Sequence, residues 1–206
     1  VLNKSVNHFY PITTKTANDA PTGLWTAKVI IGGNSWTKTL SVEAIVPNRL
    51  SVSLEAQDKI LTPNNNFFEL TGAWLHGAPT PDYDAEVSVA FSPATTSFDG
   101  YSEYTFENFS NSIDYNRKVI WTGNLDKTSK ASFNSHLQAG QNLPGKLNAH
   151  FISKIYEPSG AFSTESKTLE YSPYDKYVGI KLPKGDATRN MLLTDTDHTV
   201  DVVLLD

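Results

Sequence analysis

Hydrophobic and polar residues alternate with a period of two along most of this chain. The clearest stretch runs from Leu147 to Ile155, where Leu147, Ala149 and Phe151 are separated by Asn148 and His150. Similar stripes occur elsewhere, at Trp36, Leu40, Val42 and Ala44, at Leu50, Val52 and Leu54, and at Val87, Val89 and Phe91. Such alternation predicts strands with one buried and one solvated face, as in antiparallel sheets.

Turn residues separate these stripes. Gly32-Gly33-Asn34 can supply the positive φ that a tight hairpin needs, and Pro63–Asn66 and Pro158–Gly160 are typical of loops. No segment carries apolar residues at i, i+3, i+4 and i+7 over three turns. The pattern therefore predicts an all-β fold, an antiparallel β-sandwich of fibronectin type III or immunoglobulin type.

Counting strands divides the chain into three parts. A sandwich of this kind needs about seven strands and about 100 residues. Eight candidate strands fall between residues 49 and 171, at 49–56, 67–76, 85–92, 101–107, 117–122, 131–138, 146–156 and 161–171. About three precede them and two follow, at 177–182 and 199–205. We therefore predict part of one domain over 1–47, a complete sandwich over 48–172 and part of a third domain over 173–206.

The composition of the chain argues against several classes of function. The net charge of −5 and the absence of a basic run argue against a nucleic-acid partner. The chain has no cysteine, which excludes disulfides, thiolate nucleophiles, cysteine-ligated zinc and a thioester built from its own side chains. No apolar stretch approaches the ~18 residues that span a bilayer.

Candidate reactive groups are sparse. His76 ends a predicted strand with no nearby histidine or spaced ligand motif, so a structural role is favoured. Alternating carboxylates could ligate calcium but lack the EF-hand pattern, and a solvated edge is the favoured interpretation; they are Asp82, Asp84 and Glu86, and Asp195 and Asp197. The stretch holding Asp99, Glu103 and Glu107 also carries Tyr101, Tyr104 and Phe106, a mixture found in sugar sites. We favour a strand with inward aromatic side chains.

The four tryptophans could serve as sugar-stacking platforms or as core residues. They are Trp25, Trp36, Trp74 and Trp121. We expect at least three of them in a core, and we expect Trp25 and Trp36 to meet across one hairpin.

Several motifs, in this order, resemble one family. They are TGLWTAKVIIGG at 22–33, KTLSVEAIVPNRLSVSL at 38–54, GAWLHGAP at 72–79 and YDKYVGIK at 174–181. Together they are similar to successive macroglobulin-like domains of bacterial alpha-2-macroglobulins, and the likeness covers about residues 13–206.

This resemblance implies a large protein of the periplasm or cell envelope, often a membrane-anchored lipoprotein, that inhibits proteases of broad specificity. A bait segment is cut, the molecule rearranges and the protease is caged. Many members also capture it through a Cys-Gln thioester, but no position here can carry that role. The chain would then be a non-enzymatic scaffold with no catalytic residue, metal or cofactor. Its partners would be neighbouring macroglobulin-like domains and, through the full-length protein, proteases.

The residues assigned to this role lie at the two predicted boundaries. Pro47, Asn48 and Arg49 form the first junction, and Pro173 and Tyr174 form the second. A proline removes a ladder donor, so each boundary is a plausible hinge. The unpaired edges of the incomplete ends would also allow self-association of the chain.

A different function remains open on the residues alone. A carbohydrate-binding or adhesive module of a surface protein is also built on a β-sandwich, with Tyr101 and Trp121 as candidate contacts. An enzyme is a more distant third.

Overall fold

The computed structural model describes residues 15–16, 23–42, 48–186, 188–189 and 191–206, and in these every regular element is a strand. Contacts divide the chain into two compact units, Val1–Ile45 and Val46–Asp206. The parts of the chain that the structure describes contain no helix able to cross a membrane.

The first unit contains one hairpin of β1 (Gly23–Ile31) and β2 (Asn34–Val42). Gly32 and Gly33 form its turn with φ of 57° and 84°, as the sequence predicts. The prediction that three tryptophans lie in a core is wrong, because Trp25 is 40% exposed and Trp36 is 55% exposed. A two-stranded ribbon cannot enclose a side chain by itself. They are also not cross-strand partners, since Trp25 pairs with Leu40 and Trp36 with Val29.

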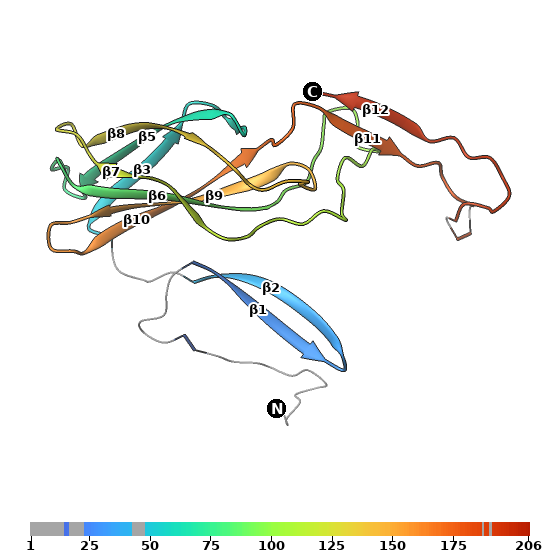
Figure 1. Cartoon of the computed structure of the whole chain (residues 1–206), viewed down its shortest axis with the longest axis horizontal. Coiled ribbons are helices and arrows are strands. Elements are labelled where there is room, and N and C mark those ends of the chain that lie inside the picture. Colours follow the sequence, from blue (N-terminus) through green and yellow to red (C-terminus); the bar gives the residue numbers. More distant parts are fainter. Residues whose placement is uncertain (1–14, 17–22, 43–47, 187, 190) are drawn as a thin grey trace. The chain divides into compact units, whose positions relative to one another are not determined.

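The second unit is built around a β-sandwich of two sheets (Figure 1). The smaller sheet has the order β3-β5-β8, and the larger has the order β4-β10-β9-β6-β7. The strands are β3 (Leu50–Ala56), β4 (Ile60–Leu61), β5 (Asn65–Trp74), β6 (Asp84–Pro93), β7 (Lys118–Asn124), β8 (Lys130–His136), β9 (Leu147–Tyr156) and β10 (Phe162–Tyr171). Pairing is antiparallel except between the short β4 and β10.

The core lies between these sheets and is formed by the predicted stripes. In β9 every second residue is buried from Leu147 to Ile155, and Leu50, Val52 and Leu54 of β3 face them. Three aromatic rings meet at its centre. The centroid of the Phe68 ring lies 5.4 Å from that of Phe133 and 5.3 Å from that of Phe151. The all-β sandwich prediction is confirmed.

One predicted strand is wrong. Residues 101–107 form a looped segment in the long connection between β6 and β7, and only Thr105 makes a β-bridge. Backbone bonds from Tyr101 to Phe98 and from Tyr104 to Tyr101 close tight turns there. The aromatic residues recur about every three positions, a spacing that places them against one another in a loop, whereas a strand would separate them onto two faces.

Beyond the sandwich, β11 (Tyr177–Lys181) and β12 (Asp201–Leu205) pair as an antiparallel ribbon, orange to red in Figure 1. Their registered pairs Val178–Leu204 and Ile180–Val202 form one apolar face that is largely exposed. Tyr177 and Gly179 lie on the opposite face, because successive strand residues alternate.

Candidate functional site: two junction regions

The first junction attaches the chain to β10. Pro47 lies outside the described residues, so the described part of this junction begins at Asn48. The side-chain amide of Asn48 donates to the carbonyl of Thr164 at 2.7 Å, and its oxygen accepts from the amide of Thr164 at 3.1 Å. This reciprocal pair imitates one step of a β-ladder, so Asn48 ties the incoming chain to β10 before β3 begins.

Ser163 supplies the next attachment. Its buried hydroxyl oxygen accepts hydrogen bonds from two successive backbone amides, Arg49 at 3.1 Å and Leu50 at 3.0 Å. The Arg49 carbonyl accepts from the amide of Leu75, which ties the turn after β5 to the same point. The start of β3 is thereby fixed to both sheets.

Arg49 also carries the charge of this junction. Its guanidinium lies 2.9 Å from a carboxylate oxygen of Glu157, whose side chain is only 5% exposed, and 5.1 Å from the centre of the Trp74 ring. Glu157 begins the β9–β10 turn, which its own amide closes by donating to Ala161. The ion pair therefore neutralises a buried charge and joins three separate segments at one end of the sandwich.

The second junction follows the other end of β10. The amide of Ser172 donates to the carbonyl of Leu61, and its hydroxyl contacts the Tyr177 hydroxyl at 2.8 Å. The Tyr174 hydroxyl donates to the carbonyl of Leu143 at 2.8 Å. Pro173 and Tyr174 line an open groove of about 550 Å³ together with the loop at 137–143.

Burial raises the pKa of two tyrosine hydroxyls in this region, Tyr171 and Tyr177. It raises the pKa of Tyr171 to about 12, and that hydroxyl donates to the carbonyl of Leu137 at 2.9 Å. It also raises the pKa of Tyr177. Both groups therefore act as neutral hydrogen-bonding side chains near pH 7, with no tendency to serve as bases.

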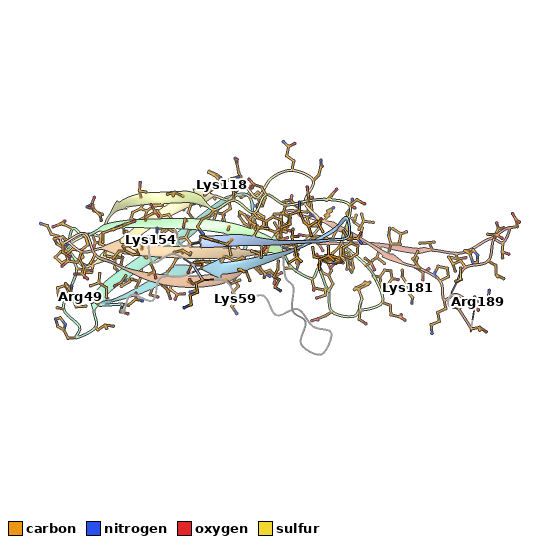
Figure 2. The ribbon with its side chains drawn as sticks, turned by 90° about the horizontal axis from the view of Figure 1, so that it is seen from below. Arg49, Lys59, Lys118, Lys154, Lys181 and Arg189 are labelled. Atoms are coloured by element: carbon orange, nitrogen blue, oxygen red, sulfur yellow. The ribbon has the colours of Figure 1, made fainter. Side chains whose placement is uncertain are left out.

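The two junctions are not one site. Asn48 and Arg49 contact the first residues of β10, whereas Pro173 and Tyr174 follow its last residue, about 30 Å away for ten strand residues. Figure 2 shows Arg49 at one end of the sandwich and Lys181 beyond the other. The strand β10 is therefore the direct covalent connection between them.

Side chains of β10 also close the outer edge of β3. Glu165 accepts from the amide of Leu54 at 2.7 Å, and Lys167 donates to the carbonyl of Leu54 and pairs with Glu55, both at 2.7 Å. These contacts occupy backbone groups that an edge strand would otherwise offer to another chain. The sandwich is therefore protected at this edge.

Sequence analysis missed the segment that contacts β11. Thr105 and Ile180 exchange two backbone hydrogen bonds of 2.9 and 3.0 Å, and the ring of Phe98 lies 5.5 Å from that of Tyr177. The only signal in the sequence was the aromatic spacing at 98–106, and residues 101–107 were predicted as a strand.

The reactive groups considered from the sequence do not assemble. His76 is exposed with its ring 5.9 Å from that of Trp74, and Asp84 accepts from Asn124. Glu103 pairs with Lys181, and Glu107 accepts from the amide of Thr96. Among the described residues, no three His, Asp or Glu side chains are grouped to hold a metal ion. Trp121 stacks on Phe133 at 4.8 Å, so it is a packing residue.

His150 gives the sandwich a pH dependence. Its ring nitrogens contact the hydroxyls of Ser92 at 2.7 Å and Thr168 at 2.9 Å, while Arg117 donates to its carbonyl at 2.9 Å. Burial, with a smaller contribution from the charge of Arg117, lowers the pKa of His150. Below about pH 6.5 the unfolded chain binds a proton here more readily than the folded chain does.

We therefore expect this contribution to stability to be complete above about pH 6.5 and to be lost as the pH falls below that value. Urea unfolding at pH 7.5, 6.5 and 5.5 measures it. His150→Gln should flatten the dependence in this window, whereas His76→Gln, at an exposed position, should leave it unchanged. Parallel curves for the wild type and His150→Gln would contradict the assignment.

The comparisons with known proteins agree on one family. A family model of the MG5 domain of bacterial alpha-2-macroglobulin matches residues 48–173. No curated protein sequence matches the chain. Among solved structures, Escherichia coli alpha-2-macroglobulin activated by porcine elastase aligns with a TM-score of 0.52 and 20% identity, covering 92% of this chain and 17% of that one.

Two further solved structures are similar. The native conformation of the Escherichia coli protein aligns with a TM-score of 0.51 and 19% identity over 84% of this chain and 11% of that one. A mutant of Salmonella alpha-2-macroglobulin aligns with a TM-score of 0.50 and 22% identity over 88% and 12%. These likenesses show the fold, and the chain spans no more than 17% of the length of any of the three.

Proposed function

Because the chain belongs to the bacterial alpha-2-macroglobulin family, with residues 48–173 matching its MG5 domain, we propose that it is a scaffold segment of a broad-spectrum protease trap. In this proposal the sandwich holds its neighbouring domains at fixed positions and transmits the rearrangement that follows bait cleavage. The observation that carries it is the pair of anchored junctions at the two ends of β10.

The proposal divides the chain into three parts. Residues 1–47 are the C-terminal part of a preceding macroglobulin-like domain, 48–172 are a complete one, and 173–206 begin the next. The exposed apolar residues of the β1–β2 and β11–β12 hairpins support this division, because isolated hairpins cannot bury such faces. The partners of these hairpins would be the remaining strands of their domains in the full-length protein.

The proposed junction residues are those chosen from the sequence. Pro47, Asn48 and Arg49 set the approach of the preceding domain, and Pro173 and Tyr174 set the departure toward the next. Asn48 and Arg49 are supported by their bonds to Thr164, Ser163 and Glu157. Tyr174 is supported by its bond to Leu143 and its lining of the groove beside Pro173.

The parent protein would act as an inhibitor in the periplasm or cell envelope, anchored as a lipoprotein. We assign no catalytic residue or cofactor to this chain, and a thioester of the parent would lie outside it because the chain has no cysteine. The open edges of the end hairpins would favour self-association of the isolated chain. A strictly monomeric species in light scattering at high concentration would argue against that association.

Capture of a protease by the full-length protein that carries this segment tests the proposal. A caged protease should cleave a small peptide but be shielded from a large protein substrate. We expect Arg49→Ala to reduce this shielding roughly fivefold, the factor that about 1 kcal/mol of lost junction energy gives. Lys59→Ala, at an exposed lysine after β3, is the matched control and should have no effect.

Two outcomes would overturn the proposal. One is a full-length protein whose captured protease cleaves a large protein substrate as readily as a small peptide. The other is unchanged shielding in Arg49→Ala together with unchanged stability, which would show that the Arg49 contacts contribute to neither property.

A further inference from the structure

The long connection between β6 and β7 reaches the β11–β12 hairpin at a point far from the linker in sequence. We use the name aromatic seat for Phe98, Tyr104, Thr105 and Phe106 of this connection. Thr105 donates to the carbonyl of Ile180 at 2.9 Å, and Ile180 donates back to the carbonyl of Thr105 at 3.0 Å. This closely spaced pair is one rung of an antiparallel ladder, so the seat adds a short third segment to the edge of β11.

The rings of the seat pack against the inner face of β11. Phe106 is almost fully buried, with its ring 4.7 Å from that of Phe98, and Phe98 in turn lies 5.5 Å from the ring of Tyr177. Gly179 lies directly over Phe106. A Cβ atom at position 179 would come within 2.6 Å of Cζ and 2.9 Å of Cδ1 of that ring, far inside van der Waals contact.

A carboxylate beside the seat pairs with a lysine of the hairpin. Lys181 Nζ lies 2.6 Å from Glu103 Oε2 and 5.9 Å from the centre of the Tyr104 ring. Because the Glu103 side chain is 64% exposed and that of Lys181 is 34% exposed, the ion pair contributes little energy. It favours one register of β11 on the seat, since a shift by one residue would move Lys181 to the opposite face.

We propose that the aromatic seat, and Gly179 facing it, fixes the orientation of the β11–β12 hairpin relative to the sandwich. The linker at 172–176 directs the chain toward the hairpin, and the seat then holds the hairpin in one orientation. The sandwich and the start of the next domain would then move as one rigid body, and the rearrangement of the trap would bend the molecule at other junctions. The last step rests on the proposed function, whereas the assignment of the seat does not.

The Phe106–Gly179 contact offers a direct test in the 206-residue chain itself. Gly179 has no positive φ, so an alanine there conflicts only with the ring. We expect Gly179→Ala to lower the hydrogen-exchange protection of the Thr105 and Ile180 amides by about tenfold or more, because the added methyl overpacks a filled contact. The amide of Phe151, in the central strand β9, reports whether the sandwich stays folded.

Three further variants complete the test. Val178→Ala changes the exposed face of the same strand and should leave both amides protected. Pro173→Gly loosens the linker and should also leave them protected. Phe106→Leu combined with Gly179→Ala should restore part of the protection, since the smaller side chain makes room for the methyl.

Unchanged protection in Gly179→Ala, or its loss in Pro173→Gly with Phe151 still protected, would overturn the assignment. Neither measurement involves a protease, so failure here leaves the scaffold proposal standing. Conversely, a parent protein that shields no protease would remove the scaffold proposal and leave the seat in place.

Discussion

Replacing Phe68 with alanine is expected to lower the free energy of unfolding of the sandwich by about 3–5 kcal/mol, the cost of truncating a fully buried phenylalanine. The Phe68 side chain is completely buried, and its ring lies 5.4 Å from that of Phe133 and 5.3 Å from that of Phe151. Since these rings come from β5, β8 and β9, the truncation opens a cavity that both sheets share. Urea unfolding at pH 7.5 followed by tryptophan fluorescence measures the loss.

The adjacent residue provides the control. Phe67 lies on the outer face of the same strand and is 38% exposed, beside Glu55 and Glu69. Phe67→Ala removes the same atoms from a position that is already partly solvated, so we expect a loss of less than about 1 kcal/mol. Equal losses at the two positions would show that β5 is not in the register described here.

This contrast explains why the strands could be predicted from the sequence. With a side-chain period of two, burial on one face forces the pattern seen in β3 and β9, whatever the partner strands are. The strand predicted at 161–171 is β10, but its bonds from Ser163, Glu165 and Lys167 to β3 carry no periodic signal. Sheet order and edge protection depend on which strands meet, and alternation does not encode that.

The aromatic seat shows where the pattern misleads. Tyr101, Tyr104 and Phe106 are residue types that favour strands, and their segment was predicted as one. Turns closed by backbone bonds at Phe98 and Tyr101 override that preference, and the rings pack on a hairpin some 70 residues later. In the same way, Trp25 and Trp36 were expected in a core but are 40% and 55% exposed in the β1–β2 hairpin. Both misses arise because alternation shows which residues share a face and does not show what covers that face.

The junction residues Asn48 and Arg49 were chosen from the position of Pro47 and from family likeness, and the contacts they make could not be foreseen. A polar residue within a strand says nothing about which backbone groups it will satisfy. Ser163 is an example, since it is one of several polar residues in β10 and nothing in the neighbouring sequence sets it apart. Its importance follows only from the two amides that converge on its hydroxyl.

Removing that hydroxyl should therefore be the most damaging single change at the first junction. Ser163→Ala leaves the amides of Arg49 and Leu50 without their acceptor, and the side-chain position is almost fully buried, so water cannot readily replace it. An unsatisfied buried donor costs about 1–3 kcal/mol, and two donors share this acceptor, so we expect a loss of about 2–4 kcal/mol in the free energy of unfolding. Thermal and urea unfolding of the 206-residue chain measure this loss.

Ser166→Ala is the matched control, because Ser166 lies on the same strand and is exposed. It should change the stability by less than about 0.5 kcal/mol. Ser163→Thr keeps the acceptor while adding one methyl, so it should recover part of the stability lost in Ser163→Ala. If Ser163→Ala matched Ser166→Ala, the attachment of the first junction through the Ser163 hydroxyl would have to be abandoned, and the other contacts of Asn48, Arg49 and β3 would hold the start of that strand.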